Sequence, residues 1–363
     1  MLVKTSFNNE LLGLLGPSVP VSLGALHQLH SRVTPIEEKL TIQAITGPDG
    51  MPVEMTPDQI PGPTGDRYRK VWASIPRDEA ITLNNGNKVK NGGAVGCTEL
   101  SLSGGVVHAK FQGIPYYALL AAKEIHTGNV LLEGAPPISL RESFAAGELG
   151  WGPGIAGGSV AVVALHEGRR KLITQIKGDE VLNGKQVHVY AFAGGLKQSE
   201  LHLGLVQLEL GTHREYLEEG GDGAPYKLSR TVGVVSEGNP PEFRSFNHVL
   251  QREDQRPITL EEFIDCVMIP YAVNRKPGEH PSKLEVRGWH IIDLDDPRII
   301  ETSNGIFSTG SSYVINQDSN GNRIIDELIE SRRLVQPVGG VLADLLVPGS
   351  GYREIVLKEA KLA

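Results

Sequence analysis

The 363-residue chain has very little cysteine: only Cys97 and Cys266, with no C-x-x-C and no zinc-binding spacing. Two free thiols in a reducing compartment are therefore the simplest interpretation. Long apolar runs are also absent, since no stretch approaches the about 20 residues of a membrane span. Glu10 precedes the first apolar stretch, Leu11–Leu15, which is too short for the core of a signal peptide. We therefore expect a cytoplasmic protein with no membrane partner.

Positively charged residues are also fewer than negatively charged ones. The chain has 35 Lys and Arg against 43 Asp and Glu, which gives a formal net charge of −8. Because a sequence-independent grip on nucleic acid needs a basic surface, we expect no nucleic-acid partner. Glycine and proline, by contrast, are abundant at 43 and 23 residues and indicate many turns between short elements. They favour a β-rich or mixed α/β architecture, and the length favours two domains.

Residues 1–155 are predicted to form a β-rich N-terminal extension without a functional motif. Turn signals at Asn84–Gly86 and an alternating pattern at Val106–Phe111 predict strands, and Tyr116–Ile125 is predicted as a helix. The glycine-rich segment Gly150–Gly158 lacks the strand and the Lys-Ser/Thr pair of a phosphate-binding loop. We interpret it as a linker or a turn into the next strand, and place the first domain boundary there.

Residues 156–300 carry a sharper pattern of strands and helices. The apolar run Ser159–Leu165 and the returning run Lys171–Ile176 predict a buried hairpin. Gln186–Phe192 alternates as a half-buried strand does, and a helical stretch then follows to about Glu219. Further predicted elements are strands at Tyr226–Ser236, Arg244–Leu250 and Lys283–Leu294, and a capped helix at Thr259–Met268.

Residues 301–363 are predicted to pack on this core as a hairpin and helices. Short strands at Gly310–Val314 and Arg323–Ile325 flank an Asn-Gly turn, and helices are predicted at Ile325–Leu334 and at the C-terminus. The turn also imitates a calcium-binding loop that begins at Asn316. A plain hairpin turn is the alternative, because a calcium loop has Asp at that first position.

The most informative run in the sequence is a cluster of glutamates. Glu215, Glu218 and Glu219 have the i, i+3, i+4 spacing that places three carboxylates on one face of a helix. Such like charges repel each other unless a divalent cation neutralises them, and Mg²⁺ prefers carboxylate together with phosphate oxygens. Arg214 can hold Glu218 one turn further on by a charge-assisted bond. The alternative interpretation is a solvated, charged helix face.

This run resembles the Nudix box, which is written G-x5-E-x7-R-E-U-x-E-E-x-G-U with U apolar. Arg214–Gly221 matches from the R to the last G, and Gly194 with Glu200 matches G-x5-E. Two departures are present. Thirteen residues separate Glu200 from Arg214 where the pattern has seven, and Asp222 stands at the final apolar position. The first departure implies an insertion of six residues between loop and helix.

The resemblance implies an α/β fold (an α+β sandwich) with a mixed sheet flanked by helices, and a Mg²⁺- or Mn²⁺-dependent hydrolase. The substrate would be a small molecule with a diphosphate bond, such as a nucleoside diphosphate linked to another group, and the ions would activate water. Glu218 and Glu219 are then expected as the principal metal ligands, with Glu200 as a further ligand. Glu215 is expected as a ligand or as the base, and Arg214 as the residue that orients the glutamates.

The resemblance also assigns the residues around the box. Gly194 and Gly195 are expected to let the backbone turn close to the substrate. A further acid would come from a later loop, for which Glu237, Glu242 and Glu253 are candidates.

Other functions stay open on the sequence alone. One is a Nudix-fold ligand-binding or regulatory module without turnover, which the insertion before Arg214 favours because it could displace the loop. Another is a structural or assembly protein, in which the glutamates form only a solvated helix face. For the hydrolase, the N-terminal extension is expected to shape the substrate pocket or a homodimer interface. Cys97 could act as a nucleophile, but no neighbouring His or Asp in the sequence supports that role.

Overall fold

The computed structural model describes the parts of the chain that carry the box and the sheet around it. Described are residues 31–37, 39–50, 53–56, 80–82, 88–90, 93–115, 154–177, 187–188, 190–202, 205–237, 243–274, 286–295, 312–328, 344–345 and 348–363. The predicted helix at Tyr116–Ile125 and the acid Glu242 lie outside these ranges. Within them, no helix combines the length and the apolar character that crossing a membrane requires.

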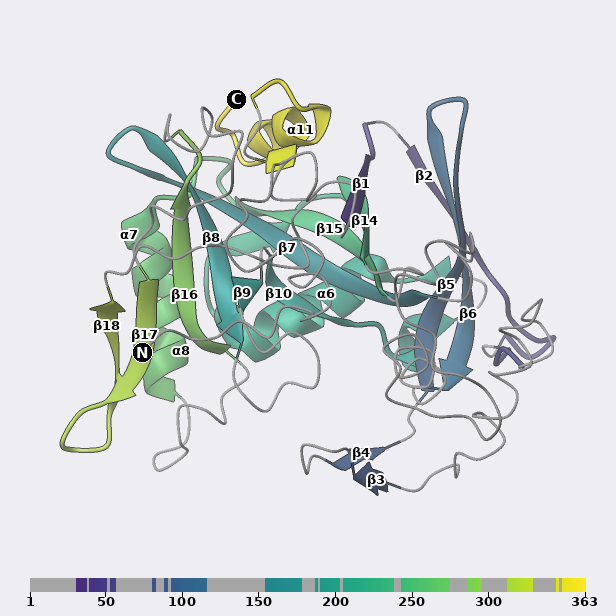
Figure 1. Cartoon of the computed structure of the whole chain (residues 1–363), viewed down its shortest axis with the longest axis horizontal. Coiled ribbons are helices and arrows are strands. Elements are labelled where there is room, and N and C mark those ends of the chain that lie inside the picture. The colour runs from purple at the N-terminus through teal and green to yellow at the C-terminus, as the bar shows by residue number, and fades with distance from the viewer. Residues whose placement is uncertain are drawn as a thin grey trace, which may run out of the picture.

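A large, mostly antiparallel sheet dominates the described residues (Figure 1). Its main path runs, in spatial order, through β1 (Ser31–Pro35), β14 (Gly233–Glu237), β15 (Phe243–Arg252), β7 (Gly154–His166), β8 (Arg169–Lys177), β16 (Val286–Asp293), β17 (Ser312–Gln317) and β18 (Arg323–Leu328). Further strands join it: β2 (Lys39–Ala44), β5 (Gly93–Ser103), β6 (Val106–Pro115), β9 (Val187–His188), β10 (Ala191–Gly195) and β13 (Tyr226–Leu228). Only β15 with β7 and β2 with β6 pair in parallel among the described strands.

Few helices accompany this sheet in the described ranges, so the protein is mixed α/β, as predicted. The helices are α6 (Leu208–Tyr216), α7 (Leu260–Phe263), α8 (Ile269–Asn274) and α11 (Gly351–Glu359). A π-helical turn, Leu217–Gly221, extends α6, and a second one, Ile264–Met268, joins α7 to α8. Two short strand pairs are not hydrogen-bonded to the large sheet: β3 (Ala80–Thr82) with β4 (Lys88–Lys90), and β11 (Leu201–His202) with β12 (Leu205–Val206).

The centre of the sheet is the predicted hairpin of β7 and β8. Both strands are rich in fully buried aliphatic side chains: Val160, Val162, Val163, Leu172 and Ile173. Strands covered on both faces have such continuous apolar runs. Gly168 turns the hairpin with a φ of 75°, a conformation that glycine adopts without steric cost.

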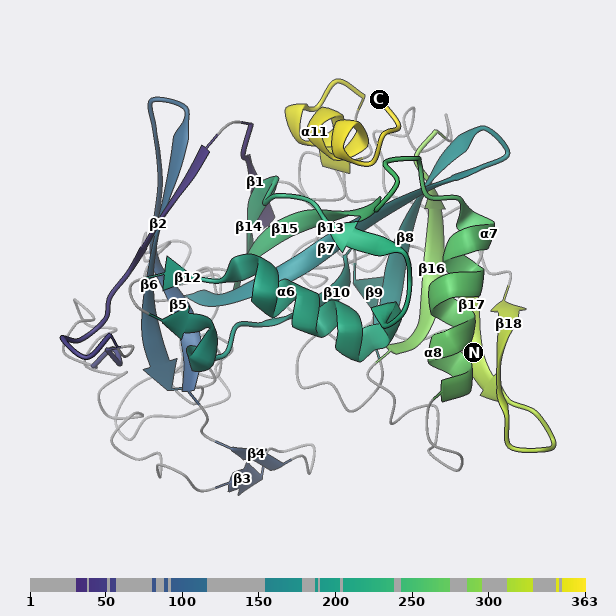
Figure 2. The same cartoon turned by 180° about the vertical axis from the view of Figure 1, so that it is seen from behind.

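Alternate residues of β7 face two separate apolar cores, because successive side chains of a strand point to opposite faces. Val163 packs in one core with Tyr352 and Val356 of α11. Val162 packs in the other core with Tyr216, the last residue of α6. Helices α11 and α6 therefore cover opposite faces of β7, as the two views in Figures 1 and 2 also show.

The second core is organised around an aromatic residue on β16. The fully buried ring of Trp289 meets the edges of Phe192, Phe263 and Tyr271, with ring centroids 6.0, 5.6 and 6.4 Å away. Phe192 in turn makes an edge contact with Tyr216 at 5.0 Å. Such aromatic pairs contribute about 0.5–1.5 kcal/mol each beyond their area burial. This cluster fixes the end of α6 against the sheet and against α7 and α8.

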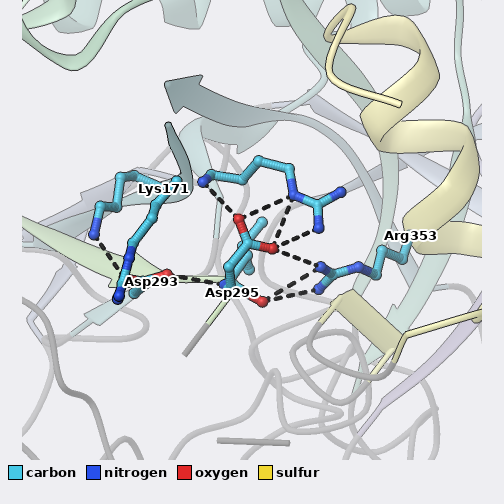
Figure 3. Close-up of polar contacts among 7 residues, drawn as sticks. Lys171, Asp293, Asp295 and Arg353 are labelled. Atoms are coloured by element: carbon cyan, nitrogen blue, oxygen red, sulfur yellow. Dashed lines mark hydrogen bonds and ion pairs between the residues drawn. The ribbon is translucent and has the colours of Figure 1, made fainter. Parts of the chain in front are cut away.

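Helix α11 is held on the opposite face by a partly buried charge network (Figure 3). Arg170 on β8 donates from Nε to Asp295 at 2.9 Å, and Arg353 of α11 reaches the same carboxylate at 3.5 Å. Lys171 pairs with Asp293 at 2.8 Å in the adjoining part of the network. The guanidinium of Arg353 is only 3% exposed, so Asp295 compensates a charge that water cannot reach.

The structure corrects the predicted linker. Strand β7 begins at Gly154, so residues 154–158 of the glycine-rich segment are strand, and the proposed boundary at residue 155 falls inside it. The side chain of Thr212 on α6 fills the space that a Cβ on Gly158 would need. A glycine here serves close packing of a helix on the strand, whereas we interpreted it as a break in the chain.

Two predicted helices are also corrected. The helix predicted at Ile325–Leu334 is wrong where it is described, because Arg323–Leu328 is strand β18, paired with β17. The β-branched pair Ile324 and Ile325 favours such a strand. The helical stretch predicted after Gly195 begins only at Leu208, and a 3₁₀ turn with a small hairpin precedes it.

Candidate functional site

The first half of the box forms a short loop at the end of β10. Gly194 and Gly195 pair with the glycines of β7, and the chain then makes one 3₁₀ turn, Gln198–Glu200. Glu200 closes this turn, because its carboxylate accepts a hydrogen bond from the backbone N–H of Lys197 at 2.8 Å. Residues 194–200 are called the box loop below. Its last side chain, Glu200, is buried.

The six-residue insertion is a separate hairpin that leaves the box intact. Strands β11 and β12 pair within Leu201–Val206, and the N–H of Gln207 donates to the carbonyl of Glu200 at 3.0 Å. The chain thus returns to its starting point after six residues. Seven residues, Gln207–His213, then lead to Arg214, which is the spacing of the family pattern. The insertion therefore does not displace Glu200 from the helix.

Arg214 joins the two halves of the box. Its Nε donates to Glu200 at 2.9 Å, its Nη1 contacts the carboxylates of Glu215 and, at 3.3 Å, of Glu218, and its Nη2 donates to the carbonyl of Gly195 at 3.1 Å. Burial acts to lower the pKa of Arg214, but the bonds and charges of Glu200 and Glu215 outweigh it and raise the pKa. One guanidinium therefore contacts three carboxylates and the loop backbone.

Glycines allow α6, called the box helix, to approach the box loop and the sheet. The carboxylate of Glu215 occupies the space that a Cβ on Gly194 would need. Gly211, one turn earlier on α6, faces Leu196 and Glu200 in the same way. At Gly195, by contrast, a Cβ would meet only a side chain at 3.6 Å, an ordinary contact. The predicted approach of these two glycines to a substrate stays a prediction, and the close contact found at Gly194 is with the box helix.

Sequence reasoning missed Gly211, although a signal was present. A glycine in the interior of a helix destabilises it by about 1 kcal/mol relative to alanine, and therefore usually has a packing reason. The reason here is the contact of α6 with the box loop.

The last glutamate of the run does not share the face of the others. Glu218 keeps 51% of its side chain exposed, whereas Glu219 is fully buried. The backbone leaves the helix at this point: Glu219 has φ −99° and ψ 17°, and Gly220 has φ 116° against the ring of Tyr271. The two residues expected as principal metal ligands thus lie in one π-helical turn but in different environments, one exposed and one buried. Such turns are frequent at functional sites.

The three predicted carboxylates Glu200, Glu215 and Glu218 gather around Arg214, and Glu219 points into the protein. In the described part of the chain, no three His, Cys, Asp or Glu side chains form a group that could hold a metal ion. The metal-ligand roles of these residues therefore stay predictions.

Of the later acids, Glu253 lies near the end of the box helix. It follows β15, and its N–H donates to the carbonyl of Pro225 at 3.1 Å. Burial, followed by electrostatic interactions with Cys266, Asp222 and Glu253, raises the pKa of Tyr216. Glu237 ends β14, at the other end of β15. The structure therefore separates two candidates that the sequence could not.

Two minor predictions resolve into structural roles. Cys97 is fully buried, and burial raises the pKa of its thiol although Arg244 acts to lower it, which disfavours a nucleophile. In the calcium-like turn the carboxylate of Asp318 accepts hydrogen bonds from the N–H groups of Asn320 and Asn322, at 2.9 and 2.8 Å. Strands β17 and β18 flank this turn, so the hairpin alternative is confirmed.

No family model and no curated protein matches the chain. The resemblance to the Nudix family therefore rests on the residues of the box and on their geometry.

Proposed function

We propose that the chain is a Nudix-type hydrolase, with a mixed sheet flanked by helices, that uses Mg²⁺ or Mn²⁺ to cleave a diphosphate bond in a small molecule. The observation that carries this proposal is the position of Arg214, which bonds to Glu200 across the inserted hairpin and to Glu215 beside Gly194. Residues from both halves of the box thus meet in space, although the sequence separates them by six extra positions. A solvated helix face would not require this arrangement.

The carboxylates around Arg214 fit a hard divalent cation in their donor chemistry, since Mg²⁺ prefers carboxylate oxygens. Among the three, Glu218 is held by the longest contact with Arg214, at 3.3 Å, and is the most exposed. We therefore assign Glu218 as the residue that exchanges its contact with Arg214 for the metal. A bound ion would neutralise the diphosphate and lower the pKa of a water molecule. Arg214, Glu200 and Glu215 keep the loop in place meanwhile.

The proton of the attacking water needs a base that can exchange protons with solvent. Glu215 is 10% exposed in its side chain and is already bonded to Arg214, so it is poorly placed to accept a proton from solvent. Glu253 is exposed and lies near Tyr216. We assign the base to Glu253 and a ligand or structural role to Glu215. Cys97 and Cys266 are free thiols in the structure, which is consistent with the cytoplasmic location that we propose.

The test is turnover of a panel of nucleoside diphosphates linked to sugars, nucleotides or other groups, with Mg²⁺ or Mn²⁺. Native protein is compared with Glu218→Gln and with the control Glu209→Gln, an exposed glutamate on the same helix outside the cluster. We expect metal-dependent release of mononucleotide that Glu218→Gln abolishes and Glu209→Gln retains. Absence of turnover and of metal binding in the native protein would refute the proposal.

A second function, ligand binding without turnover, has one observation in its favour. Glu219 is fully buried, so the box presents one fewer carboxylate to a metal than the family pattern implies. Such a module would bind a diphosphate ligand, with stabilisation against heat, and would release no product over hours. Calorimetry on the same panel distinguishes it from the hydrolase.

A further inference from the structure

The N-terminal strands reach the box loop directly, although no motif marks them. Strand β5 pairs with β7 and continues along the loop. The N–H of Val95 donates to the carbonyl of Leu196 at 3.2 Å, and Ala94 forms an antiparallel bridge with Lys197. The backbone of the box loop is therefore hydrogen-bonded to the N-terminal part of the sheet.

The inserted hairpin reaches the same strands from the other end of the loop. Leu201, directly after Glu200, is 1% exposed and belongs to one apolar cluster with Val95 of β5, Phe111 of β6 and Leu208 of α6. Strand β12 contacts β2, and Figure 2 shows the hairpin beside these N-terminal strands. The insertion thus anchors the end of the box loop in a core that residues of the N-terminal extension help to build.

We propose that strands β2, β5 and β6, together with the hairpin β11–β12, form a positioning wall for the box loop, and that Leu201 is its key positioning residue. The proposal deepens the proposed hydrolase function and rests on it for its kinetic readout. It gives the N-terminal extension a role: these strands belong to the active site although they carry none of its chemistry. It also gives the insertion a role, because the hairpin connects the end of the box loop to these strands.

The physical argument concerns Glu200, which lies between two anchors. On one side the Lys197 backbone is bridged to β5, and on the other the side chain of Leu201 is buried in the apolar cluster that includes residues of β5 and β6. Arg214 depends on Glu200 for the one carboxylate partner that the box loop supplies. If the loop shifts, Arg214 loses this partner and is free to compete with a metal for Glu215 and Glu218. Loss of a residue that supports metal ligands typically costs about 10- to 100-fold in metal affinity or activity.

The test compares two buried leucines, each 1% exposed, that lie in different cores. Leu201→Ala opens a cavity at the positioning wall, and Leu357→Ala opens one under α11, away from the box. We expect both variants to lose stability. Only Leu201→Ala should raise the Mg²⁺ concentration for half-maximal rate and lower kcat/KM, each by about tenfold. Leu201→Met, which keeps the volume, should retain both values, and Leu201→Val replaces the alanine variant if that one does not fold.

Hydrogen–deuterium exchange of the peptide that covers residues 194–200 supplies a readout independent of activity. We expect faster exchange in Leu201→Ala than in Leu357→Ala. Equal kinetics and equal exchange in the two variants would overturn the positioning role even if the native protein is an active hydrolase. Selectively faster exchange in Leu201→Ala, in a protein that turns over no substrate, would support the positioning role and refute the hydrolase.

Discussion

The carboxylate of Glu215 lies against the Cα of Gly194, in the space that any larger side chain at position 194 would fill. This contact joins the end of β10 to the box helix, and it makes the two halves of the box dependent on each other. Arg214 reinforces it, because its guanidinium bonds to Glu215 and to the carbonyl of the next residue, Gly195. A Cβ at position 194 would overlap this carboxylate, whereas a Cβ at position 195 would make only an ordinary contact, at 3.6 Å.

Gly194→Ala should therefore inactivate the protein. The added methyl group displaces the carboxylate of Glu215, and a misplacement of about 1 Å in a catalytic constellation can cost about 100-fold in rate. Gly195→Ala is the matched control, since a Cβ there meets its nearest neighbour at 3.6 Å. Steady-state kinetics on the best substrate of the panel check the prediction. Equal losses in the two variants would show that Glu215 is not held as described.

Gly211→Ala should destabilise the protein although alanine is the better helix former. In an open helix this change stabilises by about 1 kcal/mol. Here the added Cβ would lie 2.7 Å from Glu200 Oε2 and would also meet the side chain of Leu196. Overpacking of this kind costs about 1–3 kcal/mol. Urea denaturation gives the free energy of unfolding. Gly351→Ala in α11, with no atom near the new methyl group, should be neutral or stabilising.

The sequence predicts those features of the site that depend on a single helix. It does not predict those that depend on tertiary contacts. The spacing of Arg214, Glu215 and Glu218 is a property of one helix, so it could be read from the chain and is found in the structure. The burial of Glu219 could not, because it depends on a π-helical turn that Gly220 and Tyr271 impose. Helix periodicity assumes that the helix continues.

The distinction between local patterns and tertiary contacts also explains which parts of the fold could be predicted. The β7–β8 hairpin has continuous apolar runs and a local turn, so the sequence predicts it, although β7 begins at Gly154, before the predicted start at Ser159. The pairing of Val95 with Leu196 joins residues about a hundred positions apart, and no local pattern specifies such a contact. The packing roles of two glycines could not be predicted for a related reason. Gly158 and Gly211 are required by the side chains that approach them, which only the folded structure reveals.

Asp295→Asn should weaken the attachment of α11 to the sheet and lower the free energy of unfolding. The substitution removes the negative charge that Arg170 and the buried Arg353 share. Removal of one partner of a fully buried pair costs about 3–5 kcal/mol, and because Asp295 keeps some exposure we expect about 2 kcal/mol. Thermal or urea unfolding at neutral pH measures the loss. Asp265→Asn, on the exposed side of the second π-helical turn, should change the stability very little.

The same carboxylate predicts a dependence of stability on pH. Burial acts to raise the pKa of Asp295, but hydrogen bonds from Arg170 outweigh it and hold the pKa below the usual value of about 3.9. A depressed pKa in the folded state gives stability that is present above the unfolded value and is lost as pH falls through the folded one. Native protein should therefore lose this contribution below about pH 4. The difference between native protein and Asp295→Asn should shrink over the same range, and a difference that stays constant to pH 2 would contradict the network.

Glu253→Gln should separate proton transfer from metal binding. Glu237 and Glu253 lie at opposite ends of the ten-residue strand β15, which at about 3.3 Å per residue places them roughly 30 Å apart. Of the two, Glu253 contributes to the raised pKa of Tyr216 on the box helix. A general base contributes about 10²- to 10⁴-fold, so kcat should fall by that factor in Glu253→Gln while the Mg²⁺ requirement stays unchanged. Glu237→Gln should keep full activity. The reverse pattern would move the base to the other end of the sheet, and equal activity in both variants would return that role to Glu215.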